Sequence, residues 1–251
     1  MPWSRNQGGI DAMERTGTIV LNGWAASEHA WDLCAFMNRT GPDGGSPVLY
    51  SYVDQLDGLP ERAFGRGGRY VVVGWSMGGS SALRLACRYP LQIAGLVLIA
   101  ATPRMMEERD SGWKGMSPSR LEALRRGFEL THGQGFFGLP PDKPNPYIED
   151  SPENLARGLL FLKETDVRGE LSRVFADGCG FPVYVLQSEH DGIVQSSNAD
   201  YLKRIFPAAV VHRISGGEHA LPIWTPELID DAVKYGIIRA NETDCRHTHL
   251  Q

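Results

Sequence analysis

The sequence predicts an α/β fold in which a mostly parallel sheet carries helices on both faces and a helical lid is inserted after a strand ending near Ala100. Two observations predict it. Short runs rich in β-branched and aromatic residues alternate with helical patterns along most of the 251 residues. The alternation stops once, after the apolar run 96–100, and residues 103–180 then contain no convincing strand pattern.

In chain order, strands are expected at 17–22, 47–52, 70–75, 94–100, 182–187 and 209–214, and helices at 29–37, 77–89, 197–205 and 226–235. The long segment between the fourth and fifth strands is rich in proline and has helical patterns at 118–131 and 152–163. We expect it to cover the carboxyl edge of the sheet, where open α/β sheets bind ligands, although a decorative surface insertion is the alternative. The predicted division is a core at 1–102 and 181–238, a helical lid at 103–180 and a polar C-terminal tail at 239–251.

The composition of the chain disfavours several classes of function. A net charge of −5 disfavours a general nucleic-acid binder, because phosphate binding favours a basic face. No apolar run approaches the length of a membrane span, so no membrane partner is expected. The polar stretch 1–17, in which Met13 is an alternative start, contains no secretory signal. The four cysteines are widely spaced, which favours a reduced cytoplasmic compartment.

No cofactor or metal is expected. The sequence contains no dinucleotide-binding fingerprint and no phosphate-binding P-loop. The run Cys245-Arg246-His247-Thr248-His249 has ligand-like spacing, but it lies in the predicted polar tail, where such spacing is more often accidental than a metal site.

The pentapeptide Gly74-Trp75-Ser76-Met77-Gly78 follows the apolar run 70–73 and precedes a helical pattern. Strand, G-x-S-x-G and helix in that order are typical of a nucleophile elbow, which presents a serine hydroxyl above the sheet edge. The flanking glycines allow the sharp turn, and the backbone N–H of Met77 is expected to face a developing oxyanion. The alternative is a glycine-rich turn that packs a helix on a strand.

A serine nucleophile needs a base and a group that orients the base, and in this kind of elbow they follow in the order serine, acid, histidine. The acid is expected just after the strand 182–187, and we assign it to Asp191, because Asp-Gly is a turn pair that can direct a carboxylate inward. Glu189 is the rival acid. The loop after the strand 209–214 contains His219, which we expect to be the base, whereas His190 and His212 are expected to be structural.

A second oxyanion donor is expected after the first strand. Gly23 allows a close backbone approach there, and the backbone N–H of Trp24 is the candidate donor. The indole of Trp24 is expected to form a wall of an apolar pocket, with a plain core role as the alternative. Asp would have to replace Ser76 in a haloalkane dehalogenase, so that reaction class is excluded.

With these residues placed, the chain resembles the α/β-hydrolase superfamily, and within it the pimeloyl-acyl-carrier-protein methyl ester esterases of biotin synthesis. The resemblance covers nearly the whole chain and is carried by Leu21-Asn22-Gly23-Trp24 with Trp31, Gly74-Trp75-Ser76-Met77-Gly78-Gly79, Ala101-Thr102-Pro103, Gly112-Trp113-Lys114-Gly115-Met116, Gly158-Leu159-Leu160-Phe161-Leu162-Lys163, Thr165-Asp166-Val167-Arg168, Asp191-Gly192-Ile193-Val194 and Glu218-His219-Ala220. Two departures stand out. Asn22 replaces the usual histidine, and the centre of the lid at 136–141 follows no pattern of the family.

The resemblance implies hydrolysis of the methyl ester of a pimeloyl chain on acyl carrier protein, with Phe128 as a pocket wall. An acidic carrier needs cations at the pocket mouth, and the lid offers Arg120, Arg125, Arg126, Arg157 and Lys163. A solvated charged face is the equal alternative for these residues, because acidic residues are about as frequent on the lid. The rival functions are a generalist carboxylesterase, lactonase or C–C-bond hydrolase, an acyltransferase, and a non-catalytic binding protein.

Overall fold

The computed structural model describes residues 16–39, 45–64, 68–148 and 151–248, with side chains through residue 240. A parallel sheet of six strands forms its centre, in the order β2-β1-β3-β4-β5-β6. The strands are β1 (Thr16–Leu21), β2 (Val48–Tyr50), β3 (Arg69–Trp75), β4 (Ile93–Ile99), β5 (Val183–Ser188) and β6 (Val210–Ile214). Because β2 and β3 lie on opposite sides of β1, the strand order reverses between β1 and β3, and ligand sites of open sheets form at such switch points.

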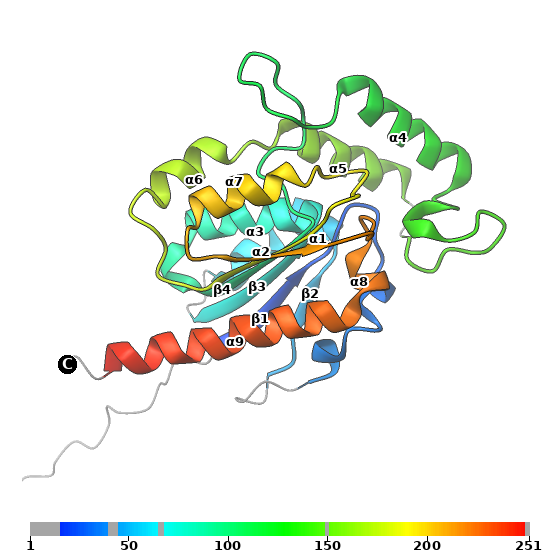
Figure 1. The fold of residues 1–251 in the computed structure, drawn as a ribbon. Helices are drawn as coiled ribbons and strands as arrows, with labels where there is room; N and C mark the ends of the chain where they lie inside the picture. Colours follow the sequence, from blue (N-terminus) through cyan, green and yellow to red (C-terminus); the bar gives the residue numbers. More distant parts are fainter. Residues whose placement is uncertain (1–15, 40–44, 65–67, 149–150, 249–251) are drawn as a thin grey trace, which may run out of the picture.

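Helices cover both faces of the sheet, as expected (Figure 1). On one face lie α3 (Met77–Arg88), α6 (Arg168–Val174) and α7 (Ser197–Ile205), which share a core with the sheet through Leu83, Leu171 and Leu202. On the other face α9 (Pro226–Thr248) packs against the sheet together with the short helix α8 (Leu221–Trp224). The central strand β4 is apolar along its whole length and all of its residues are buried, as a parallel strand covered on both faces requires.

The segment between β4 and β5 contains α4 (Pro118–Thr131), the short helix η4 (Phe136–Gly138), α5 (Pro152–Glu164) and α6. Figure 1 shows α4 and α5 beyond the sheet, with α4 farther from the strands than α5. A third apolar cluster joins this segment to the loop after β1: Leu121, Phe128 and Leu159 pack with Trp24 and Met77.

Several local expectations were wrong in detail. The expected helix 29–37 is two short 3-10 helices, η1 (Glu28–Trp31) and η2 (Ala35–Asn38). The expected strand 47–52 keeps only the three residues of β2, because a capping box between Ser51 and Asp54 starts helix α1 (Tyr52–Leu56). The connection to β3 also contains α2 (Leu59–Phe64), and η3 (Pro90–Gln92) precedes β4.

The expected helix 226–235 is too short, because α9 continues to Thr248 and so includes residues 239–248 of the predicted polar tail. The helix extends past the region where its apolar residues meet the sheet, which is why the pattern 226–235 marked only its first half. Cys245 and His247 therefore lie on α9, whereas His249, like Met1 and Met13, lies outside the described residues. None of the described helices is both long and apolar enough to cross a bilayer.

Candidate active site

Ser76 stands in the turn between β3 and α3 with φ 55° and ψ −117°, a strained backbone conformation for a residue with a side chain. Hydrogen bonds hold the turn on both sides. The Ser76 N–H donates to the Ile99 carbonyl at 2.9 Å, and the Ser76 carbonyl accepts from the Gly79 N–H at 2.9 Å. The expected strand, turn and helix are therefore present, and the nucleophile candidate sits at the carboxyl end of a central strand.

The two glycines of the pentapeptide allow backbone segments to pack closely around the turn. The residue with a positive φ in this turn is Ser76 and not a glycine. Neither Gly74 nor Gly78 has a positive φ. A Cβ on Gly74 would lie 2.4 Å from the Gly78 carbonyl oxygen, and one on Gly78 would lie 2.1 Å from the Leu21 carbonyl oxygen. Only glycine therefore lets α3 start this close to β1 and β3, and this packing keeps Ser76 in its strained conformation.

The structure brings the three side chains predicted as nucleophile, base and acid into one hydrogen-bonded chain. The Ser76 Oγ lies 2.8 Å from His219 Nε2, and His219 Nδ1 lies 2.9 Å from Asp191 Oδ2 and 3.1 Å from Asp191 Oδ1. The side chain of Asp191 is fully buried and that of His219 is 14% exposed. The rival acid Glu189 is exposed at the surface of the same loop.

Asp191 is held as a carboxylate. Burial by itself raises the pKa of this side chain, but the charge and hydrogen bond of His219 and the backbone N–H groups of Val194 and Ile193 outweigh it, so the pKa is lowered from its usual 3.8. Both N–H groups donate to Oδ1, at 2.8 and 2.7 Å. The buried Gln187 adds a longer bond from its Nε2 to Oδ2, at 3.3 Å. A fixed carboxylate of this kind orients the imidazole and stabilises its protonated form.

Trp75, next to the nucleophile, was not predicted to have a site role. Its indole Nε1 donates to the His219 carbonyl at 3.0 Å, and its ring lies 6.0 Å from the imidazole, centroid to centroid. Trp75 therefore fixes the backbone of the loop that carries the base. The signal that could have found it was its place in the pentapeptide, directly before the serine.

Asn22 organises the loop that carries the predicted second oxyanion donor. Its Oδ1 accepts from the Gly23 N–H and from the Trp31 indole, both at 3.0 Å, and its Nδ2 donates to the carbonyls of Ala26 and Ser27. The residue that departs from the usual histidine is thus a buried structural anchor. A Cβ on Gly23 would lie 3.4 Å from the Cβ of Ser76, so this loop passes directly beside the serine.

The side chain of Trp24 connects the loop after β1 to α5 and lines the cavity. Its indole Nε1 donates to the Leu155 carbonyl of α5 at 3.0 Å, and the side chain also lines the cavity above Ser76. Gly158 makes room for it, because a Cβ there would lie 2.4 Å from the Trp24 Cδ1. The oxyanion role of the Trp24 and Met77 N–H groups stays a prediction.

A cavity of about 610 Å³ opens above Ser76 and His219. Its walls come from the loops after β1, β3, β5 and β6 and from the segment between β4 and β5. They are mostly apolar, and they include Trp24, Trp75, Met105, Leu124, Phe136, Phe137, Leu162 and Ile193. Phe136 and Phe137, in the part of the sequence that matched no family pattern, were not predicted as site residues.

Phe128 lies behind the cavity wall. It is 1% exposed and packs with ring centroids 5.3 Å from Trp24 and 4.9 Å from Phe136, both of which line the cavity in front of it. Phe128 therefore supports two lining rings, and the expectation that it forms the wall itself was wrong. In the sequence, the apolar character and helical spacing of Phe128 do not show whether its ring lines the cavity or lies behind the lining residues.

The four lid arginines predicted as carrier contacts differ in position. Arg120 lines the cavity mouth, and its guanidinium donates to the Gly192 carbonyl beside Asp191. Arg125 and Arg126 are paired with Glu122 on the same helix, and Arg125 also with Glu129. The guanidinium of Arg157 is 2.6 Å from Asp57.

An ion-pair network fastens the two ends of the segment between β4 and β5. Arg104 lies 2.6 Å and Arg168 2.7 Å from Asp166, and Arg168 also reaches Glu108 at 2.8 Å. Burial raises the pKa of Asp166, but hydrogen bonds from Arg168 and Arg104 outweigh it and lower the pKa to about 2. Asp166 and Arg168 lie in one of the stretches that carried the family resemblance, and in this network they hold the segment in place.

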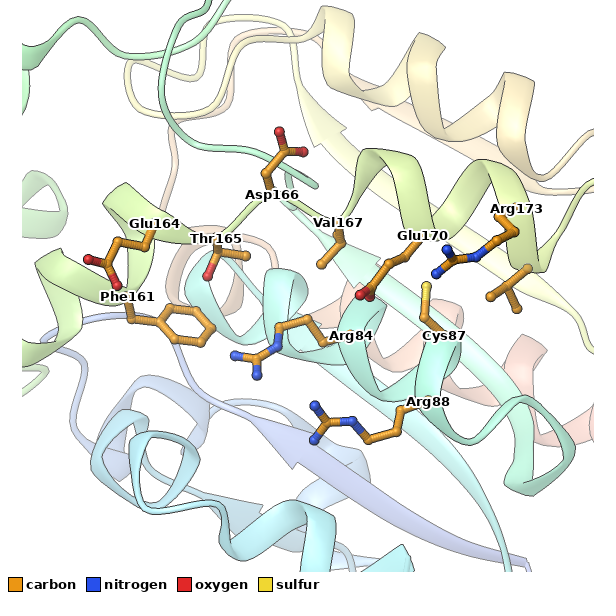
Figure 2. Close-up of a pocket in the computed structure, with 11 residues that line it drawn as sticks. Arg84, Cys87, Arg88, Phe161, Glu164, Thr165, Asp166, Val167, Glu170 and Arg173 are labelled. Atoms are coloured by element: carbon orange, nitrogen blue, oxygen red, sulfur yellow. The ribbon is translucent and has the colours of Figure 1, made fainter.

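A second hollow, of about 510 Å³, lies where α3, α5 and α6 meet (Figure 2). Arg84 and Arg88 reach into it from α3, while Asp166 points away from them. Cys87 also lines it, but burial and the nearby Glu170 raise the pKa of this thiol to about 12, so the nucleophilic thiolate is suppressed at neutral pH. The charged residues that line this hollow are balanced in sign: Arg84, Arg88 and Arg173 are matched by Glu164, Asp166 and Glu170.

The sequence was compared with protein families and with known proteins, and both comparisons match this architecture. The model of the family described as alpha/beta hydrolase fold matches residues 26–226. The pimeloyl-[acyl-carrier protein] methyl ester esterase of Nitrosomonas europaea is 29% identical over 78% of this chain and 87% of that protein. The protein of the same name from Aromatoleum aromaticum is 27% identical over 88% of this chain and all of that protein.

Solved structures agree on the fold. An esterase from Exiguobacterium antarcticum superposes with a TM-score of 0.65 at 16% identity, over 88% of this chain and 92% of that one. A bromoperoxidase from Bacillus anthracis gives 0.66 at 18% identity, over 88% and 91%. The predicted fold class and the predicted resemblance are confirmed, and the predicted class of enzyme, a carboxylic ester hydrolase, agrees with the names of the relatives. With its parallel sheet and a family match over residues 26–226, this chain belongs to the α/β-hydrolase family.

Proposed function

We propose that the protein is a serine carboxylesterase whose nucleophile, base and acid are Ser76, His219 and Asp191. The observation that carries the proposal is the continuous chain of short contacts from Ser76 Oγ through the imidazole to a buried carboxylate, at the floor of an apolar cavity. A serine hydroxyl becomes a competent nucleophile only with such a base and an orienting group. A receptor without catalysis has no need for this arrangement.

The reaction takes place in two halves. With Nδ1 protonated and donating to Asp191, the free Nε2 of His219 accepts the proton of Ser76 as Oγ attacks the ester carbonyl. The tetrahedral intermediate collapses as the C–O bond to the alcohol breaks, and His219 gives the proton to the leaving alkoxide. Water then loses a proton to His219 as it attacks the acyl carbonyl. The bond from the acyl carbon to Oγ breaks, His219 returns the proton to Ser76 Oγ, and the acid leaves.

The negative oxygen of the intermediate needs preorganised donors. We assign this role to the backbone N–H groups of Met77, at the first turn of α3, and of Trp24, on the loop beside Ser76. Each such donor contributes about a hundredfold or more to the rate in comparable sites. The Asn22 hydrogen bonds keep the Trp24 loop in shape before substrate arrives, which is the preorganisation that this role requires.

For the substrate, we propose the methyl ester of a pimeloyl chain on acyl carrier protein, in biotin synthesis. Relatives with this name cover most of the chain. The apolar walls of the cavity suit a methylene chain, and its volume is that of a pocket for a small ligand. Arg120, at the cavity mouth, is the best placed of the four arginines to meet an acidic carrier, with Arg125, Arg126 and Arg157 farther out on the same segment.

A generalist carboxylesterase is the second candidate, and one observation favours it. Arg125, Arg126 and Arg157 already have carboxylate partners within the protein, so a carrier would have to compete with these ion pairs.

One experiment separates the two candidates. Hydrolysis of the carrier-bound pimeloyl methyl ester is compared with hydrolysis of the free dimethyl ester of pimelic acid, for the wild type and for Arg120→Ala. A carrier-dependent enzyme should prefer the bound ester by orders of magnitude in kcat/KM, and Arg120→Ala should reduce that preference at low salt. Equal kcat/KM for both esters would contradict the carrier and leave the generalist esterase.

A further inference from the structure

Phe137 is a cavity-lining residue held in an unusual conformation. Its backbone has φ 59° and ψ 26°, and it lies between Gly135 and Gly138, which also have positive φ values of 78° and 75°. A non-glycine residue keeps a left-handed backbone only where its surroundings determine it. Position 137 therefore has a phenylalanine in a backbone conformation that favours glycine, which is unusual for a loop residue.

Two tryptophans fix Phe137. The indole Nε1 of Trp224, on α8, donates to the Phe137 carbonyl at 2.8 Å. The ring of Phe137 packs 5.4 Å from Trp75, centroid to centroid, and Trp75 in turn holds the His219 carbonyl. Trp224 remains 50% exposed, so the hydrogen bond to Phe137, and not burial, fixes its indole beside the Phe137 loop. The loop is thereby attached to the base side of the site.

Acid–base chemistry assigns that side to the leaving alcohol. His219 takes the Ser76 proton and then protonates the alcohol oxygen, so this oxygen has to come within hydrogen-bond reach of Nε2. The oxyanion is assigned to the Met77 and Trp24 N–H groups, and the Gly23 loop that carries Trp24 passes beside Ser76. Phe137 meets this side of the cavity through Trp75, whose ring lies 5.4 Å from Phe137 and 6.0 Å from the imidazole. A Cβ on Gly138 would lie 3.4 Å from Glu218 Oε2, next to His219 in the chain.

We propose that Phe137 sets the size of the alcohol subsite, restricting it to esters of small alcohols such as methanol, and that Trp224 is the positioning residue that holds Phe137 there. The inference rests on the proposed esterase function, but not on the carrier. It makes the alcohol side, formed in part by the stretch 136–141, a determinant of specificity separate from the acyl side near Trp24 and Leu162.

The test varies the two halves of the ester separately. Methyl, butyl and benzyl hexanoate differ in the alcohol, and methyl acetate, hexanoate and octanoate differ in the acyl chain. In Phe137→Ala, the benzyl-to-methyl ratio of kcat/KM should rise about tenfold or more, the scale on which apolar pockets discriminate by size. The octanoate-to-acetate ratio of methyl esters should stay within about twofold, well below that scale. Phe137→Leu, a milder change, should give a smaller rise of the same sign.

Trp224→Phe keeps an apolar ring but removes the Nε1 donor, and it should raise the benzyl-to-methyl ratio without matching Phe137→Ala. Leu130→Ala is the control, because Leu130 is 83% exposed on α4 and does not line the cavity; its ratios should equal those of the wild type. An unchanged alcohol ratio in an active Phe137→Ala enzyme would overturn the inference and leave the esterase proposal intact. Failure of the wild type to hydrolyse any of these esters would overturn both.

Discussion

The indole Nε1 of Trp75 donates a hydrogen bond to the backbone carbonyl of His219 at 3.0 Å, so the residue before the candidate nucleophile holds the loop of the candidate base. The two residues are 144 positions apart in the chain. Trp75 is completely buried, and its ring also contacts Trp31 and Phe137. One side chain therefore joins the serine turn, the base loop and the loop that covers the cavity.

Trp75→Phe tests this connection, because it keeps a buried aromatic ring and removes the donor. We expect kcat for methyl butyrate to fall about fivefold while KM changes little, since the lost bond, worth about 1 kcal/mol, orients the base and does not bind substrate. Steady-state kinetics in a pH-stat give both constants. A matched control is Trp113→Phe, which removes an indole bond to the Arg104 carbonyl, away from the cavity lining; a similar fall in kcat there would count against a specific role for Trp75.

Asp191→Asn keeps the shape of the acid and removes its charge. We expect kcat to fall by about 10⁴, the loss seen when a triad carboxylate of this type is neutralised. Glu189→Gln changes the rival acid and should leave kcat within about twofold, as an exposed surface substitution does.

Asp191→Asn also tests how the stability of the wild type depends on pH. The pKa of Asp191 in the folded protein lies below its ordinary 3.8, so ionisation of this group stabilises the fold fully above that value, and the contribution is lost as pH falls through the folded pKa. The difference in unfolding free energy between the wild type and Asp191→Asn, measured by urea denaturation, should therefore shift against the wild type when the pH is lowered from about 6 to about 3. A difference that is constant over this range would show that the carboxylate has no special environment.

Gly158→Ala tests the packing of Trp24 against α5. The new Cβ would lie 2.4 Å from the Trp24 Cδ1, so the indole and its loop have to move. We expect a loss of stability of about 1–3 kcal/mol from overpacking and a clear loss of kcat as the loop beside Ser76 shifts. Gly127→Ala is the control, since a Cβ at that position in α4 meets nothing within 4 Å and should stabilise the helix by about 0.5–1 kcal/mol. Equal effects of the two substitutions would contradict the packing argument.

Much of the core could be predicted because local patterns and the fold agree. The six strands appear within a few residues of the expected positions, since a parallel strand covered on both faces is an apolar run that a sequence shows directly. The elbow was predictable for a related reason. The close packing at Gly74 and Gly78 leaves no room for a side chain, so the need for it appears in the sequence as glycine at these two positions.

Other parts depend on contacts that no local pattern contains. The depth of Phe128 depends on Trp24 and Phe136, which line the cavity in front of it, and an aromatic residue at helical spacing does not show this in the sequence. The end of α9 was missed because its last turns extend beyond the sheet and so lose the apolar stripe that marks a packed helix. The role of Asn22 required knowing that Trp31 folds back onto it.

The most direct test of the central claim is covalent labelling by a fluorophosphonate, together with hydrolysis of methyl butyrate, in the wild type and in Ser76→Ala. The account predicts that one adduct forms on Ser76 in the wild type. In Ser76→Ala, labelling should disappear and kcat should fall by about a million-fold, with an unchanged circular dichroism spectrum. Retention of labelling or of esterase activity by a folded Ser76→Ala protein would contradict it.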